Sequence, residues 1–81
     1  MTTLDRVAIG VSARVLTVEG SDDISVRLME MGLTPGVSVI VLGAAPLGDP
    51  LELEVRGYRL SVRKSEAARV QVEPRAAFRA L

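Results

Sequence analysis

The 81-residue chain contains no cysteine and no histidine. Without cysteine it can form no disulfide, bind no metal through thiolates and use no thiol nucleophile. Without histidine it lacks the commonest general base and the commonest metal ligand of proteins. The glycines also form no phosphate-binding loop of a known pattern. We therefore expect a protein that is not an enzyme, with no cofactor and no metal site.

Aromatic residues are almost as scarce, because Tyr58 and Phe78 are the only two. Proteins that bind single-stranded nucleic acids combine stacking aromatic residues with a positive groove, and SH3 domains bind polyproline segments in aromatic-lined grooves. The formal net charge here is zero. The composition therefore disfavours both kinds of ligand, and we expect no nucleic-acid partner.

Long apolar runs are absent as well. The first ten residues lack the basic region and apolar run of a signal peptide. The uncharged stretch at residues 37–48 is interrupted by Gly43, Pro46 and Gly48 and is shorter than the roughly 20 residues of a spanning helix. We expect a cytoplasmic protein that does not insert into a membrane.

Charge is distributed unevenly along the chain. Residues 1–55 carry three basic and eight acidic side chains, and residues 56–81 carry seven basic and two acidic ones. This asymmetry hints at a basic patch in the second half. Length and a hydrophobic content of 48% allow one core, so we expect a single domain over residues 1–81, with its core at about 9–73 and a tail at 74–81.

Short β-branched or alternating segments, separated by glycine and proline, predict a mainly β fold. Five strands are expected at residues 11–18, 37–42, 51–56, 58–63 and 69–73. One helix is expected at about 22–31, with short helical turns at 3–9 and 64–68. Five short strands cannot bury both faces of an open sheet, so the sequence predicts a small SH3-like five-stranded barrel with one or two short helices.

The expected helix has clear signals at both ends. Asp22 and Asp23 are typical of a helix start, and we interpret them as cap and dipole partners rather than a pair of metal ligands. Gly32 is typical of a helix end. Ile24, Leu28 and Met31 share one face, which we expect to enter the core.

The two alternating segments around Gly57 predict a β-hairpin, whose turn centres on either Arg56-Gly57 or Gly57-Tyr58. Glu52 and Glu54 are expected to face Arg59 and Arg63 as a solvated ladder of ion pairs rather than as catalytic acids. Residues 37–42 are rich in β-branched residues, which predicts a strand buried on both faces for most of its length.

Partner-binding residues are expected at three places. The helix side opposite the core face carries apolar residues that are either exposed or covered by the N-terminal segment. An apolar residue in the loop at 43–50 either tucks into the barrel or meets a partner. The third place is a basic edge. The candidates are Val26, Met29 and Leu33 for the helix side, Leu47 for the loop, and Arg59, Arg63 and Lys64 for the basic edge.

Four segments together carry a resemblance to a known family. They are Arg27-Leu-Met-Glu-Met-Gly-Leu-Thr-Pro-Gly36, Ala45-Pro-Leu-Gly-Asp-Pro50, Arg56-Gly-Tyr-Arg-Leu-Ser-Val-Arg63 and Glu66-Ala-Ala-Arg-Val-Gln-Val72. In this order and spacing the chain, from about Ile9 to Glu73, closely resembles the FeoA family of small ferrous-iron transport proteins. Residues 75–81 lie outside these segments.

The resemblance implies an SH3-like fold and a cytosolic accessory protein of bacterial ferrous-iron uptake. It also implies a partner, the FeoB-type membrane GTPase permease, contacted through its cytoplasmic GTP-binding region. Self-association is compatible with the same reading. The alternative is a free-standing regulatory module related to the C-terminal domain of metal-dependent repressors of the diphtheria-toxin-repressor type. Direct iron binding does not follow, because only carboxylates are available and none cluster at ligand spacing.

Overall fold

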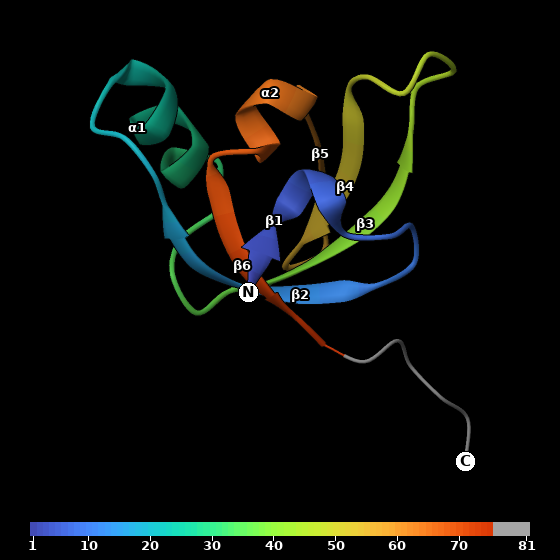
Figure 1. The fold of residues 1–81 in the computed structure, drawn as a ribbon, viewed down its shortest axis with the longest axis horizontal. Coiled ribbons are helices and arrows are strands. Elements are labelled where there is room, and N and C mark those ends of the chain that lie inside the picture. Colours follow the sequence, from blue (N-terminus) through green and yellow to red (C-terminus); the bar gives the residue numbers. More distant parts are fainter. Residues whose placement is uncertain (76–81) are drawn as a thin grey trace.

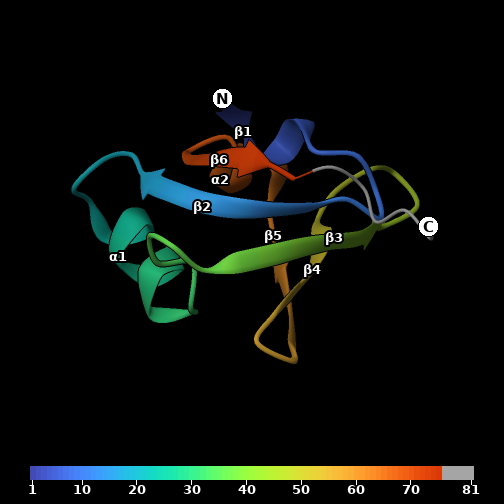
Figure 2. The ribbon, with the colours of Figure 1, turned by 90° about the horizontal axis from the view of Figure 1, so that it is seen from below.

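The computed structural model describes residues 1–75, which form one six-stranded antiparallel sheet with three short helical segments. The order of strands in the sheet is β1-β6-β2-β3-β4-β5 (Figures 1 and 2). The strands are β1 (Thr2–Thr3), β2 (Ser12–Val18), β3 (Ser38–Ala44), β4 (Leu51–Val55), β5 (Tyr58–Val62) and β6 (Val70–Pro74). The helices are the 3-10 turn η1 (Leu4–Arg6), α1 (Asp23–Glu30) and α2 (Lys64–Ala67).

The sheet curls strongly but does not close, because β1 and β5 are its two ends. Register shifts at Val15/Thr17 in β2 and at Val41/Gly43 in β3 interrupt the regular pairing. Such bulges bend a strand and increase its twist, which lets a few strands wrap around one core. The expected mainly β fold with short helices is confirmed.

The N-terminal segment belongs to the core, although the sequence placed the start of the core at about residue 9. Thr2 and Thr3 pair with Val72 and Gln71, which adds a sixth strand to the five expected. Leu4 is fully buried, and η1 packs against α2 and β6. A two-residue strand is too short to give a periodic pattern, so the sequence alone could not reveal it.

Helix α1 begins and ends where its signals predict. The Asp22 carboxylate accepts a hydrogen bond of 3.2 Å from the Ser25 backbone N–H, which confirms Asp22 as the N-cap. Leu28 is fully buried, while Ile24 and Met31 are partly buried and pack against the core. This confirms the predicted core face of the helix.

Strand β3 differs from its prediction. Ser38 and Ile40 are exposed, whereas Val39 and Val41 are buried, so the strand alternates instead of being buried on both faces. The reason is that an antiparallel sheet can leave one face to solvent, and the valines and isoleucine at 37–42 do not by themselves reveal which of them face outward.

The hairpin turn consists of Arg56 and Gly57. Both have positive φ, at 53° and 84°, as a two-residue turn of the primed type requires. Val55 therefore pairs with Tyr58 and Leu53 with Leu60. This settles the choice that the sequence left open between two turns.

Candidate functional site

Both helices and the loop between β3 and β4 rise from the same side of the sheet (Figure 1). Between them lies a cleft of about 400 Å³, which we call the helix–loop cleft. It is lined by Arg27, Met31, Asp49, Pro50, Ser61, Arg63 and Glu66. The loop, both helices and β5 all contribute to this hollow.

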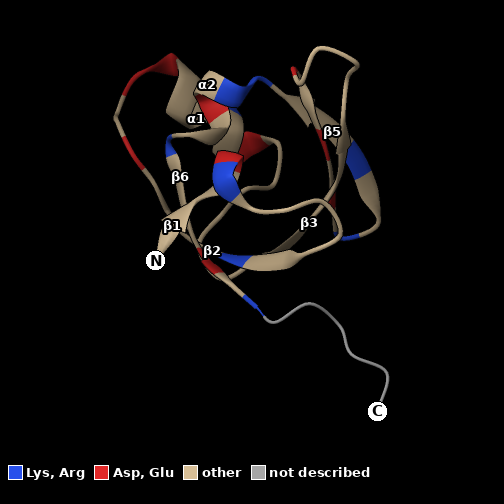
Figure 3. Cartoon of the chain, turned by 45° about the vertical axis from the view of Figure 1, so that its right-hand side comes forward, with Lys and Arg blue, Asp and Glu red and all other residues tan. Residues whose placement is uncertain are grey.

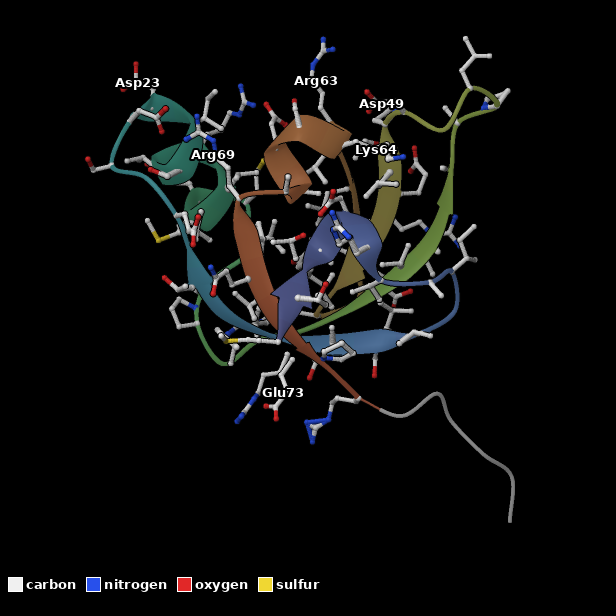
Figure 4. The ribbon with its side chains drawn as sticks, in the orientation of Figure 1. Asp23, Asp49, Arg63, Lys64, Arg69 and Glu73 are labelled. Atoms are coloured by element: carbon white, nitrogen blue, oxygen red, sulfur yellow. The ribbon has the colours of Figure 1, made fainter. Side chains whose placement is uncertain are left out.

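Polar contacts hold the walls of the helix–loop cleft together. Arg27 of α1 forms an ion pair with Glu66 of α2. Glu66 also accepts a hydrogen bond of 3.2 Å from the Arg63 backbone N–H, which caps α2. On the opposite wall, the Asp49 carboxylate accepts a hydrogen bond of 2.9 Å from the Lys64 backbone N–H, and the two residues lie side by side in Figure 4.

The chemistry open to this cleft is recognition of a polar group. Its two carboxylates, on Asp49 and Glu66, are already engaged by protein donors. Within residues 1–75, no three carboxylates gather in a way that could hold a metal ion. Arg63 brings a positive charge to the cleft that no ion pair within this range neutralises.

Val26 and Met29 are exposed on α1, at 46% and 37% of their surface. The N-terminal segment does not shield them, because it packs on β6 and α2 instead. The choice that the sequence left open is therefore resolved in favour of exposure, and we call these two side chains the α1 stripe.

Leu33 was expected to continue this stripe, and that expectation is wrong because Leu33 is fully buried. Its backbone N–H binds the Leu28 carbonyl at 3.1 Å, and the Gly32 N–H binds the Met29 carbonyl at 3.0 Å. These two bonds form a Schellman motif, in which the residue after the glycine folds back onto the helix. Gly32, at φ 112°, reverses the chain, so helical periodicity cannot be extended past it.

Leu47 is 96% exposed and stands at the tip of the β3–β4 loop. The loop is held by hydrogen bonds from Gly48 N–H to the Ala45 carbonyl, at 2.7 Å, and from Ala45 N–H to the Pro50 carbonyl, at 3.0 Å. The side chain is thus presented outward by an ordered turn. Figure 1 places α1 and this loop on opposite sides of α2, so the α1 stripe and Leu47 do not form one patch.

Arg59, Arg63 and Lys64 are all exposed, along β5 and the start of α2. The predicted ladder of ion pairs is absent between residues 1 and 75: Glu54 lies opposite Arg59, but no ion pair joins them. Glu52 lies opposite Ser61 and accepts a hydrogen bond of 2.8 Å from its hydroxyl group. Figure 3 shows the hairpin at the right, with basic residues on one strand and acidic residues on the other.

Most residues of the helix–loop cleft were not predicted from the sequence as binding residues; Arg63 was the one exception. Arg27, Asp49, Ser61 and Glu66 are ordinary surface residues in their own segments. They come from four separate elements, and no local pattern signals that the fold brings them together.

A family model and a curated relative indicate the same family for this chain. The family described as the FeoA domain matches residues 2–74. Over 70 residues the chain is 34% identical to the Fe(2+) transport protein A/Fe(2+) transporter FeoB fusion protein of Porphyromonas gingivalis. That match covers 86% of this chain but only 8% of the fusion protein.

Solved structures confirm the fold. Stenotrophomonas maltophilia FeoA complexed with zinc, described as an SH3 domain protein, is 35% identical, with a TM-score of 0.79 over 90% of this chain and 91% of that one. ScaR with bound Zn²⁺ gives a TM-score of 0.78 at 23% identity, over 90% of this chain and 36% of that one, a likeness of fold alone. The expected SH3-like fold is thus found. Among residues 1–75, no helix is both long and apolar enough to span a membrane.

Proposed function

Because this chain belongs to the FeoA family, we propose that it is a cytoplasmic accessory protein of bacterial ferrous-iron uptake. It acts by binding the FeoB-type permease on the permease's GTP-binding region. It regulates the permease and catalyses no reaction of its own.

The fusion protein of P. gingivalis is the observation that carries this proposal. Its name describes an FeoA and an FeoB in one polypeptide. Joining two modules keeps them at a high effective concentration, which is useful when they act on each other. A protein that resembles the FeoA part of the fusion is therefore best explained as a partner of an FeoB-type transporter.

The α1 stripe is the surface that we assign to this contact. Exposed apolar side chains cost free energy in water, and an interface removes that cost. Val26 and Met29 lie on an ordered helix whose opposite face is fixed in the core by Leu28. A rigid helix face can dock without a loss of backbone entropy.

Leu47 is a second, separate contact. The hydrogen-bonded loop fixes its side chain in an exposed position, where it can enter a shallow apolar pocket of the partner. The β3–β4 loop and helix α1 lie on the two sides of α2 (Figure 1). A partner that engages both would cover the helix–loop cleft between them.

Copurification tests the proposal. The chain is mixed with the GTP-binding region of a permease from the same cell, with and without nucleotide, and the complex is isolated. We expect a complex that weakens when Val26 and Met29 are both changed to Gln. Absence of a complex in every nucleotide state would refute the proposed function.

The likeness of fold to ScaR supports one second candidate, a regulatory module that acts on transcription. A gel shift with promoter DNA at physiological salt distinguishes the two. We expect no shift, because the chain is neutral and the region between residues 1 and 75 contains a single aromatic residue, Tyr58.

A further inference from the structure

Strand β5 is a free edge of the sheet. It ends the strand order, and the other edge, β1, has only two residues. An edge strand offers a row of backbone N–H and C=O groups that can pair with another chain. Tyr58, Arg59 and Ser61 of β5 are exposed, so this edge is accessible to solvent.

The hairpin register shows which backbone groups point outward. A two-residue turn is closed by a hydrogen-bonded pair, here Val55 and Tyr58. Pairs along an antiparallel ladder alternate between hydrogen-bonded and non-hydrogen-bonded, so Arg59 and Ser61 are non-hydrogen-bonded residues. Their N–H and C=O groups therefore point away from β4, toward the open side.

Two observations agree with this assignment. Side chains approach more closely in non-hydrogen-bonded pairs, and the Ser61 hydroxyl reaches the opposite Glu52 at 2.8 Å. No hydrogen bond outside the sheet uses the backbone of Arg59 or Ser61 among the residues that the structure describes. Two outward donors and two outward acceptors are thus available at the centre of the edge.

The edge is also basic. Residues 56–64 contain four basic side chains and no acidic one, namely Arg56, Arg59, Arg63 and Lys64. None of the four is in an ion pair within the described part of the chain, where the three ion pairs use Arg14, Arg27 and Arg69. The open backbone row is therefore lined by positive side chains that are in no ion pair with the described residues, although Glu54 lies opposite Arg59 on the neighbouring strand.

We propose that the β5 edge binds an extended acidic segment of a protein partner, which adds to the sheet as a further strand. The backbone groups of Arg59 and Ser61 pair with this segment, and its carboxylates meet the basic side chains along the edge. This site is separate from the α1 stripe, and its test does not depend on the permease.

Charge decides between this occupant and the other candidates. A second copy pairing edge to edge would bring the arginines of two β5 strands together, and like charges across a strand pair are destabilising. A nucleic acid could meet the basic side chains, but it offers no alternating backbone donors and acceptors for Arg59 and Ser61. An acidic peptide satisfies both features at once.

The probe is a peptide of about seven residues that alternates Glu and Val, long enough to span the edge. Its affinity is measured by fluorescence anisotropy, and hydrogen exchange of individual amides is followed by NMR. We expect binding to slow the exchange of the Arg59 and Ser61 amides. A Lys/Val peptide should not bind. N-methylation of alternate peptide nitrogens should abolish binding when the methylated nitrogens are the ones that face Arg59 and Ser61.

A charge-reversed variant with Arg59→Glu and Arg63→Glu tests the side chains. We expect it to weaken binding about tenfold or more, because each reversal removes one attraction and adds one repulsion. Arg6→Glu, an exposed position on η1, is the matched control and should leave binding unchanged.

A Ser61→Pro variant removes the outward N–H, and Ser61→Ala controls for loss of the hydroxyl group. Far-ultraviolet circular dichroism verifies that each variant folds. Three results would each overturn the proposal: unchanged exchange at Arg59 and Ser61, equal binding of the N-methylated peptide, or equally tight binding of a DNA oligonucleotide.

Discussion

The Nη1 atom of Arg69 lies 2.6 Å from the Oδ1 atom of Asp22 and donates a hydrogen bond to it. This contact joins the start of β6 to the N-terminus of α1, although the two residues are far apart in the sequence. The same carboxylate caps the helix by accepting a bond from Ser25 N–H. Figure 4 shows Arg69 directed toward the helix.

The pKa of Asp22 is the first prediction. The hydrogen bond from Arg69 and the cap on Ser25 lower this pKa from 3.8 to about 2. Because this pKa is lower in the folded state than in the unfolded state, the ionised carboxylate stabilises the fold at pH values above the ordinary pKa of about 4. This stabilisation is lost as the pH falls from about 4 toward 2. NMR titration of the carboxyl carbon should show the low value.

Arg69→Ala should raise the Asp22 pKa toward its ordinary value, whereas Arg69→Lys should raise it less because a cation remains. An unchanged Asp22 pKa in Arg69→Ala would show that the cap alone holds the value down.

Gly20→Ala should disturb the same contact. A Cβ at position 20 would lie 2.9 Å from Nη1 of Arg69, and the φ of Gly20 is 96°. Gly10 has a similar φ of 88° and open space around it, so Gly10→Ala is the matched control for backbone strain. Each variant should lose about 1 kcal/mol of stability through its φ.

The two glycine variants should differ in the Asp22 pKa. Gly20→Ala displaces the flexible Arg69 side chain and should raise that pKa, whereas Gly10→Ala should not. A rise in both variants would mean that the effect does not come from the contact with Arg69.

The α1 stripe and the buried residues beside it should respond differently to substitution. Changing Val26 and Met29 to Gln should alter stability by about 0.5 kcal/mol or less per site, while weakening partner binding. Leu28→Ala and Leu33→Ala remove fully buried side chains and should each destabilise the fold by about 2–5 kcal/mol. Thermal melting and the copurification assay measure the two effects separately.

Two results would contradict this assignment. A large loss of stability in the double variant would place Val26 and Met29 in the core. Unchanged copurification would move the docking surface to another part of the molecule.

Asp49→Ala should loosen the β3–β4 loop. The carboxylate holds the Lys64 N–H at 2.9 Å, and a bond of this kind contributes about 0.5–1.5 kcal/mol. Hydrogen exchange at Lys64 should accelerate, while Asp49→Asn, which keeps an acceptor oxygen, should restore much of the protection. Equal exchange of the Lys64 amide in the unsubstituted protein, Asp49→Ala and Asp49→Asn would mean that the hydrogen bonds within the loop hold it without Asp49.

Local signals in the sequence determined most of the elements. The cap at Asp22, the stop at Gly32 and the alternation on either side of Gly57 act over a few residues, so α1 and the hairpin were predicted close to their observed bounds. The four segments around these signals were also sufficient to indicate the FeoA family.

Only the tertiary structure decided which residues are buried, which strands lie at the edges of the sheet and which residues meet in the helix–loop cleft. The burial of Leu33 depends on the reversal at Gly32, and the alternation of β3 depends on which side of the sheet is covered. The pairing of Thr2 and Thr3 with β6, the contact of Asp22 with Arg69 and the helix–loop cleft join residues that are distant in the sequence. Sequence periodicity reports only local geometry, whereas these features arise when the chain closes around one core.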